Sequence, residues 1–381
     1  MRSLLLFAFL GGISTVQAIG TAKGFGSATT GGGSAAPATP TSKEQLITWL
    51  SDSTPRVILL TSIFDFTSYY GTTTGPICKP WSCTPNPQLA INTSGWCSST
   101  APTGTATWYN SGASRSLVVG SNKTLLGKGS SSGLKGIGLS IRGVSNVIIQ
   151  NIVISDLNSQ YVWGGDAIDI GGSTNVWIDH NYIKNVGRQM LVIHFEPSTG
   201  ITISNNYFDG RATYSTGCDG HHYWVFLLPG QGDQITIAQN YIYYTAGRGP
   251  HTGGTSGNTQ QVHIVNNYFN SITGHALDSD VGSVVLAEGN YFNSVKTPSV
   301  AGTAGSEFFI QSSSDVATCN AAMGRTCQAN TLVGSGSVAA RVDAAVMKSL
   351  KSLDGVKKYT PIATSQVPSY VLANAGVGKV N

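Results

Sequence analysis

Charged side chains are scarce in this sequence. Asp, Glu, Lys and Arg make up 10% of its 381 residues, whereas about 25% is usual for a soluble domain. The formal net charge is only +4 and there is no basic stripe, so the sequence favours neither nucleic-acid binding nor a polyanion clamp. Glycine is abundant instead, with 47 residues or about 12% against a usual ~7%. A loop-rich surface of Asn, Ser, Thr and Gly is expected.

Long apolar runs are missing after the first residues. The N-terminus has Arg2, the apolar run 4–10 and then Val16-Gln17-Ala18, which is typical of a secretory signal with a small-x-small cleavage site. No later stretch approaches the roughly 20 apolar residues that span a bilayer. We therefore predict a signal peptide over residues 1–18, and a mature chain over residues 19–381 that is soluble, secreted and extracellular, without a membrane partner.

Cysteine spacing of the zinc type is also missing, because the sequence has no CxxC pair and no His/Cys cluster. An even number of cysteines in an exported chain predicts three disulfides, and sequence leaves fifteen pairings open. The six cysteines are Cys78, Cys83, Cys97, Cys218, Cys319 and Cys327. Sequons at Asn92 and Asn122 are predicted glycan sites.

Helical periodicity is nearly absent between residues 115 and 295, and a tripeptide repeat stands in its place. Asn-Tyr-(Ile/Phe) begins at Asn181, Asn206, Asn240, Asn267 and Asn290. The spacings of 25, 34, 27 and 23 residues suit coils with loops of variable length, and such coils must stack to bury their apolar faces. Stacking brings the asparagines into register as a ladder. The repeat therefore predicts a parallel β-helix.

Short β-branched segments precede each asparagine and agree with this fold. They cover residues 147–152, 176–181, 201–206, 235–240 and 262–267. An antiparallel sandwich with turn asparagines is the alternative, but its hairpins would not place one tripeptide at the same point of every unit.

The remaining segments are expected to cover the ends and one side of the stack, so the chain is predicted to form a single domain. Ser42-Lys43-Glu44-Gln45 is a capping box that predicts a helix to about Asp52, over the N-terminal end of the stack. Residues 67–107 hold three cysteines, which predicts a disulfide-stapled excursion on the side of the stack. Residues 338–353 predict an amphipathic helix near the C-terminus.

Five motifs, in order, resemble the fungal pectin lyases of the pectate lyase superfamily, and the resemblance runs from Ala22 to Gly376. The motifs are Val162-Trp163-Gly164-Gly165-Asp166-Ala167-Ile168, Val176-Trp177-Ile178-Asp179-His180, Gly187-Arg188-Gln189, Cys218-Asp219-Gly220-His221-His222-Tyr223-Trp224 and Gly247-Arg248-Gly249-Pro250.

The resemblance implies an all-β, single-stranded, right-handed parallel β-helix with an N-terminal capping helix, a C-terminal tail and helix, and a monomeric state. It also implies the disulfides Cys78–Cys97, Cys83–Cys218 and Cys319–Cys327. Its activity would be β-elimination in methylesterified polygalacturonate (pectin), which leaves 4,5-unsaturated methylgalacturonate ends.

β-Elimination removes the proton α to the carboxyl group and expels the glycosidic oxygen, so negative charge develops on the carboxyl oxygens. An acid substrate needs a cation such as calcium to offset its charge, whereas a methyl ester does not. In this sequence Arg188 stands where related pectate lyases carry a calcium-binding carboxylate, so we predict no metal and no cofactor. An ion pair of Arg188 with Asp166 or Asp169 that holds two coils together is the alternative, and both can be true.

By the same resemblance the catalytic residues are Arg248, Arg188 and Asp166. Arg248 corresponds to the proton-abstracting residue of the family. Guanidinium is normally charged at every accessible pH, so stabilisation of the enolate is its alternative role. Asp166 would orient one of the two arginines.

Predicted substrate-binding residues surround the arginines. Apolar ring faces suit sugar C–H surfaces and methyl esters and disfavour free carboxylates. The residues are Trp81, Trp96, Trp163, His222, Tyr223, Trp224 and His251. His222 either bonds substrate or braces the loop at Cys218. The sequence departs from the pattern at His251, where many relatives have lysine, and a histidine is only partly charged near neutral pH.

Two other functions stay open. A calcium-dependent pectate lyase would need carboxylates from successive coils, and Arg188 stands where one is wanted. A non-catalytic polysaccharide-binding solenoid would need only the aromatic residues. A polygalacturonase would need paired catalytic aspartates in a hydrolase arrangement, and no such constellation is found around Gly274-His275.

Overall fold

The computed structural model describes residues 18, 20–339 and 341–380. The predicted signal peptide lies outside these residues except for Ala18, so it stays a prediction. Within the described part of the chain, no helix is both long and apolar enough to cross a membrane.

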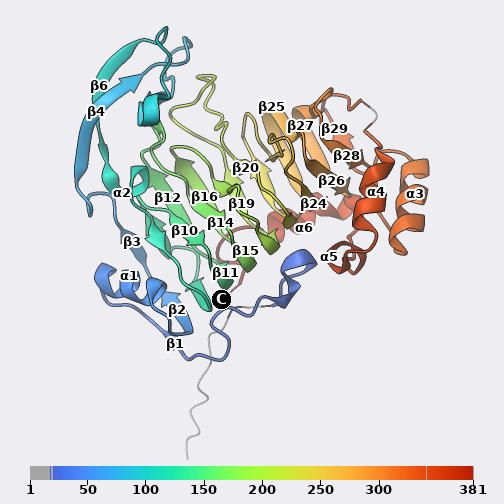
Figure 1. The fold of residues 1–381 in the computed structure, drawn as a ribbon, viewed down its shortest axis with the longest axis horizontal. Helices are drawn as coiled ribbons and strands as arrows, with labels where there is room; N and C mark the ends of the chain where they lie inside the picture. Colours follow the sequence, from blue (N-terminus) through green and yellow to red (C-terminus); the bar gives the residue numbers. More distant parts are fainter. Residues whose placement is uncertain (1–17, 19, 340, 381) are drawn as a thin grey trace, which may run out of the picture.

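The chain winds into coils that stack along the long axis of the molecule, from β2 at one end to β28 at the other (Figure 1). Each coil contributes one strand to a ten-stranded sheet and one or two to a fifteen-stranded sheet. All pairings within these two sheets are parallel. The predicted parallel β-helix is confirmed.

The ten-stranded sheet contains, in spatial order, β1 (Pro37–Ala38), β2 (Arg56–Leu60), β8 (Lys123–Gly127), β11 (Ser145–Gln150), β15 (Thr174–Asp179), β18 (Thr199–Ser204), β21 (Asp233–Ala238), β24 (Gln260–Val265), β26 (Ser283–Glu288) and β28 (Ser306–Phe309). Five of these strands, β11, β15, β18, β21 and β24, cover the segments that the sequence predicted.

The fifteen-stranded sheet has two branches, which the long strand β25 joins. One branch contains β3 (Ile63–Asp65), β9 (Gly133–Lys135), β12 (Val153–Leu157), β16 (Tyr182–Val186), β19 (Tyr207–Asp209), β22 (Tyr241–Tyr243), β25 (Tyr268–Ser279), β27 (Tyr291–Ser299) and β29 (Thr331–Val333). The other contains β7 (Leu117–Val118), β10 (Leu139–Arg142), β14 (Ile168–Gly171), β17 (Leu191–Ile193), β20 (Phe226–Leu228) and β23 (His251–Thr252).

An asparagine ladder fixes the register between coils. Asn206 is fully buried, and its Oδ1 accepts hydrogen bonds from the backbone N–H and the side-chain amide of Asn181, both at 2.9 Å. Its Nδ2 donates to the Ile178 carbonyl and to Asn240 Oδ1. The same pattern continues through Asn267 and Asn290 to a sixth member outside the tripeptide repeat, Asn330. The ladder therefore satisfies turn backbone that would otherwise be buried without partners.

The residue before each ladder asparagine turns the chain. His180, Asn205, Gln239 and Asn266 all have φ between 50° and 57°, a left-handed conformation that is uncommon outside glycine but tolerated by Asn and His. After the asparagine, the tyrosines stack outside and the Ile or Phe side chains lie in the core. One tripeptide thus sets the corner, the ladder and the inner face of each coil.

The ends of the stack are covered. At the N-terminal end, Ser42 Oγ accepts the Gln45 N–H and begins α1 (Lys43–Ser51). The Gln45 side chain accepts the N–H of Thr41 rather than that of Ser42, so the predicted capping box forms only in one direction. The helix ends at Ser51, within one residue of the prediction.

The predicted helix over residues 338–353 is too long. It is replaced by α4 (Ala344–Leu350), which Asp343 caps, and by the single turn α5 (Asp354–Lys357). The remaining helical segments are η1 (Gly24–Ala28), η2 (Thr93–Gly95), α2 (Asn110–Ala113), α3 (Ser313–Met323), η3 (Thr364–Gln366) and α6 (Val367–Asn374). Helices α3, α4 and α5 gather at the C-terminal end of the stack (Figure 1).

The excursion predicted over residues 67–107 forms a small sheet of β4 (Thr72–Cys78), β5 (Leu89–Ile91), β6 (Thr103–Tyr109) and β13 (Tyr161–Val162). Strands β4 and β6 form a long antiparallel pair that projects from the stack (Figure 1). The three disulfides are those that the resemblance implied: Cys78–Cys97, Cys83–Cys218 and Cys319–Cys327. The second ties the excursion to the loop between β19 and β20.

Candidate active site

Arg188 and Asp166 form a fixed ion pair between two successive coils. Asp166 lies between β13 and β14, and Arg188 lies between β16 and β17. Arg188 Nε and one terminal nitrogen donate to the two carboxylate oxygens at 3.0 and 2.8 Å, the fork-to-fork geometry of a strong arginine–carboxylate pair. The Gln189 N–H also donates to Asp166, at 2.7 Å. The guanidinium carbon lies 3.9 Å from the ring centre of Trp163, so Arg188 is held on two sides.

Arg248 lies in the loop between β22 and β23 and is held differently. Its guanidinium carbon lies 4.9 Å from the ring centre of Trp224 and 5.7 Å from that of Tyr223. Among the described residues it forms no ion pair with a carboxylate within 4.0 Å. Burial lowers the pKa of Arg248, and the nearby charge of Arg188 acts in the same direction. The two arginines thus interact electrostatically, and only Arg248 keeps its charge uncompensated by a direct partner.

Two residues that the sequence analysis did not select complete this region. His275 and Asp278 both lie on β25. The Arg248 N–H donates to His275 Nε2 at 3.1 Å, and His251 Nδ1 lies 2.6 Å from Asp278 Oδ2. Both pairs are separated by 27 residues, as are Asn240 and Asn267 of the ladder. That shared spacing is the signal that could have found them, because it places one residue of each pair on the next coil.

His222 has a structural position, in which its side chain connects two backbone segments of the site. The side chain is fully buried, and its Nε2 lies 2.9 Å from the Arg188 carbonyl and 3.1 Å from the Trp224 carbonyl. Burial lowers its pKa to about 4, so the ring is neutral and donates to both carbonyls. His222 thus connects the backbone of Arg188 to the aromatic residue beside Arg248.

The remaining aromatic residues extend the site toward the excursion. The ring centres of Trp81 and Trp224 lie 6.3 Å apart, edge to face. Trp81 and Trp96 line a pocket of about 530 Å³ between Cys78 and Pro102, and neither arginine reaches this pocket. Trp96 is the more exposed of the two, with 39% of its surface accessible.

Gln88, also missed by the sequence analysis, joins the excursion to the arginine site. It is buried, its Oε1 accepts the indole N–H of Trp224 at 2.9 Å, and its amide donates to the Gly187 carbonyl at 2.7 Å. No spacing in the sequence relates Gln88 to either partner. Gln88 thus connects the excursion to the loop of Trp224 and to the residue before Arg188.

The side chains of both sequon asparagines are bonded within the fold. Asn92 Oδ1 accepts the Cys97 N–H at 3.0 Å, and Asn122 Oδ1 accepts from the side-chain amide of Asn146 at 2.9 Å. Both side chains are half-buried. Glycosylation of Asn92 and Asn122 stays a prediction.

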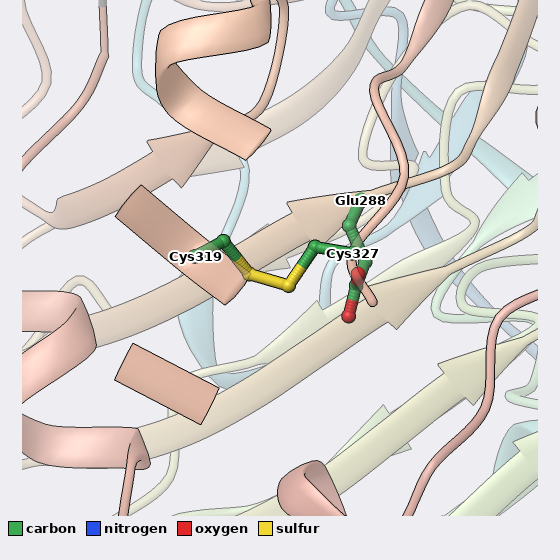
Figure 2. A group of neighbouring side chains, drawn as sticks. All are labelled: Glu288, Cys319 and Cys327. Atoms are coloured by element: carbon green, nitrogen blue, oxygen red, sulfur yellow. A yellow bond between two sulfur atoms is a disulfide. The ribbon is translucent and has the colours of Figure 1, made fainter. Parts of the chain in front are cut away.

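The carboxylates near Arg188 do not fit a calcium site. Both oxygens of Asp166 are bonded to Arg188, and Asp169, which lies between the buried residues Ile168 and Ile170 on its strand, pairs with Arg142 and His194. Among the described residues, the one group of three possible ligands with donor atoms within 4.8 Å is Glu288, Cys319 and Cys327. Its two sulfur atoms are joined to each other (Figure 2).

Comparison with known proteins identifies the family. The sequence profile of the pectate lyase family matches residues 2–380. The chain is 46% identical over 389 residues to a probable pectin lyase F of Aspergillus niger, covering 100% of this chain and 80% of the relative. It is 44% identical over 384 residues to pectin lyase B of Emericella nidulans, covering 99% and 98%.

Solved structures show the same fold at lower identity. A pectate lyase from Bacillus sp. N165 in complex with trigalacturonate is 19% identical, with a TM-score of 0.57 over 94% of this chain and 100% of that one. A Bacillus subtilis pectate lyase mutant is also 19% identical, with a TM-score of 0.57 over 97% and 100%. With these matches, the chain belongs to the pectate lyase family and, within it, to the pectin lyases.

Proposed function

We propose that this protein is a secreted pectin lyase, which cleaves methylesterified polygalacturonate by β-elimination without a metal ion. The predicted leader and the three disulfides support export, since structural disulfides persist in oxidising compartments. The names of its relatives support the substrate class.

The observation that carries the proposal is the Arg188–Asp166 pair. A calcium-dependent enzyme needs free carboxylate oxygens to hold the cation, and here those of Asp166 are bonded to a guanidinium. By the resemblance to pectate lyases, the Arg188 guanidinium stands where a calcium-binding carboxylate would be, and Asp166 holds it there. A substrate whose carboxyl group is esterified brings no charge that a divalent cation must offset.

Arg248 is the group that faces the reacting carbon in this proposal. When the C5 proton leaves, negative charge develops on the ester oxygens, and a fixed cation in a partly dry site stabilises it more than water would. The lowered pKa of Arg248 favours its neutral form as the acceptor of the C5 proton, and the guanidinium formed by this transfer is then the cation beside the ester oxygens. The electron pair forms the C4–C5 double bond, the C4–O4 bond breaks, and O4 takes a proton from water.

Trp163, Trp224, Tyr223, Trp81 and Trp96 provide the substrate surface. Their rings can pack against sugar C–H groups and methyl esters and would disfavour desolvation of free carboxylates. His222 positions Arg188 and Trp224 from behind. His251 contributes from the next strand, with Asp278 as its partner.

The direct test follows the ultraviolet absorbance of the unsaturated product. The protein is incubated with highly methylesterified pectin and, separately, with polygalacturonate, each with calcium or with a chelator. We expect signal on pectin that persists with chelator. Signal only on polygalacturonate with calcium would replace the proposal by a pectate lyase, and no signal on either would favour a non-catalytic binding solenoid.

Arg248→Lys tests the assigned residue. We expect kcat on pectin to fall by at least about 100-fold with little change in KM, because the lost contact is made mainly in the transition state. The matched control is Arg211→Lys, an exposed arginine paired with Asp209 on the outer face, which should keep kcat within about twofold. Equal losses in the two variants would remove Arg248 from the proposed site.

A further inference from the structure

The backbone of Arg248 is held in an uncommon conformation. Its φ is +51°, a left-handed geometry that is unfavourable for a residue other than glycine and persists only where the surroundings impose it. The preceding residue is confined as well, because a Cβ atom at Gly247 would lie 2.5 Å from the Tyr223 ring and 3.1 Å from His275. The direction in which the guanidinium points thus depends on these neighbours.

One hydrogen bond accounts for the alignment. The Arg248 N–H donates to His275 Nε2 at 3.1 Å, and a backbone amide can only donate, so Nε2 must carry a lone pair. His275 is therefore neutral, with its proton on Nδ1, whenever this bond is made. The ring also packs edge-on against Tyr223, with centres 5.8 Å apart.

A second partner lies within reach of the same nitrogen. Asp278 Oδ2 lies 3.9 Å from His275 Nε2 and 2.6 Å from His251 Nδ1. If Nε2 gained a proton it would become a donor, could no longer accept the Arg248 N–H, and would have a carboxylate to turn toward. Protonation of His275 and alignment of Arg248 are thus mutually exclusive.

The surroundings of His275 favour the neutral ring at ordinary pH. Tyr223 and Arg248 face it from the loops before β20 and β23, His251 from β23, and Asp278 from β25, while β27 places the neutral Thr297 beside it. Burial lowers the pKa of His275, and the charges of His251 and Arg248 lower it further against the opposing effect of Asp278. Protonation therefore requires acid below the ordinary range of a histidine.

We propose that His275 is the positioning residue for Arg248, and that its protonation switches the site off in acid through transfer of Nε2 from the Arg248 amide to Asp278. This inference rests on the proposed function. It adds a specific protonation requirement, which a merely structural histidine would not impose.

The pH dependence of kcat on pectin tests the switch. In the wild type we expect kcat to fall as the pH falls through the pKa of His275. His275→Gln keeps an acceptor oxygen that does not titrate, so this acid limb should disappear or move by at least one pH unit. His275→Phe keeps the ring packing but removes the acceptor, so kcat should fall about 10- to 100-fold at every pH with KM changed less than about threefold.

His194→Gln is the matched control. His194 is also half-buried, lies just beyond β17, and faces a carboxylate, Asp169, at 3.4 Å. Its substitution should keep the acid limb in place. Wild-type kcat in His275→Phe, or an unchanged acid limb in His275→Gln, would overturn the proposal.

Nitrogen NMR of the Arg248→Lys protein separates this proposal from the proposed function and needs no activity. Histidine is labelled with ¹⁵N, and the His275 signals are assigned by their loss in His275→Gln. We expect Nε2 to show the shift of an unprotonated ring nitrogen at pH 7 and to gain a proton on acidification. A proton on Nε2 at pH 7 would refute the positioning role. If that signature appeared but the wild type did not cleave pectin, only the proposed function would fail.

Discussion

Some single buried side chains make the stability of this fold depend on pH. His222 is one of them, because its ring is neutral in the folded protein. Its pKa falls from 6.5 to about 4 because of burial. Between these values the unfolded chain binds more protons than the folded one, so stability rises with pH across this window and is lost as the pH falls through it. The shift of roughly 2.5 units corresponds to about 3 kcal/mol.

His222→Gln should reduce this acid sensitivity, because a glutamine amide can donate to the same two carbonyls without titrating. We expect the variant to lose about 3 kcal/mol less than the wild type in free energy of unfolding between pH 7 and pH 4. Urea unfolding at pH 7, 5.5 and 4 measures the difference. Parallel pH dependences for the two proteins would show that His222 is not the titrating group.

Asp233 should act with the opposite sign. It is buried at the start of β21, its Oδ1 accepts the Ser198 N–H at 2.8 Å, and its Oδ2 has no partner among the described residues. Burial raises its pKa to about 7, so between the ordinary value of 3.8 and pH 7 the folded chain binds more protons and stability falls as the pH rises.

Asp233→Asn keeps the acceptor for Ser198 and removes the charge. The variant should exceed the wild type by about 2–4 kcal/mol at pH 8 and match it near pH 4. Thermal and urea unfolding at both pH values provide the measurement. A variant that is less stable than the wild type at pH 8 would mean that the carboxylate has a stabilising partner there.

At the scale of elements, the asparagine ladder makes each coil depend on the next. Asn206→Ala removes four hydrogen bonds, and it leaves the buried Asn181 N–H without its acceptor. At roughly 1–3 kcal/mol for a buried orphan and about 1 kcal/mol for each further lost bond, the free energy of unfolding should fall by about 3–5 kcal/mol.

Asn293→Ala is the control for the ladder. This asparagine is half-buried on the outer face, and its two hydrogen bonds are 3.2 and 3.3 Å long, so its loss should cost less than about 1 kcal/mol. Chemical denaturation of both variants measures the contrast. Similar costs at the two positions would mean that the ladder follows from the stack rather than stabilising it.

The elements that could be predicted from the sequence are those marked by a repeated motif. The tripeptide marks a corner of each coil, and similar spacing marks neighbouring coils, so five strands of the ten-stranded sheet could be placed from the sequence. The sequence analysis did not predict Asn330 as a member of the ladder, because Thr331 follows it whereas tyrosine follows the other asparagines. The C-terminal helix was predicted too long because its apolar pattern extends in sequence to both sides of α4, whereas Asp343 caps the helix and sets its start at Ala344.

The residues of the candidate site also fall into two groups, those that the sequence analysis predicted and those that it missed. The resemblance implied Arg188, Arg248 and Asp166, and the structure pairs Arg188 with Asp166. Gln88 and the brace formed by His222 depend on contacts between segments that no periodicity relates. Side chains that act across such contacts become visible only when the fold brings the segments together.

At the scale of the whole molecule, one disulfide joins the excursion to the coils. Cys83 and Cys218 are 135 residues apart in sequence, and their bond ties the segment that carries Trp81 to the loop that carries Trp224. The Arg188–Asp166 ion pair and the hydrogen bond from the Arg248 N–H to His275, in contrast, are coil contacts outside this loop, although Arg248 also packs on Trp224. The structure therefore separates a substrate-gripping part from a catalytic part.

Removal of the bond should reveal that separation. A Cys83→Ser/Cys218→Ser variant loses the closure of a long loop, which the chain-entropy model values at about 3–5 kcal/mol, so its Tm should fall. The KM for pectin should rise several-fold as Trp81 loosens from Trp224, while kcat stays within about threefold.

The control is Cys319→Ser/Cys327→Ser, whose cysteines are only 8 residues apart and lie at the other end of the stack, at α3. It should lower the Tm less and leave KM unchanged. If KM rose equally in both variants, the effect would be global loosening, and the excursion would not be a separate binding element.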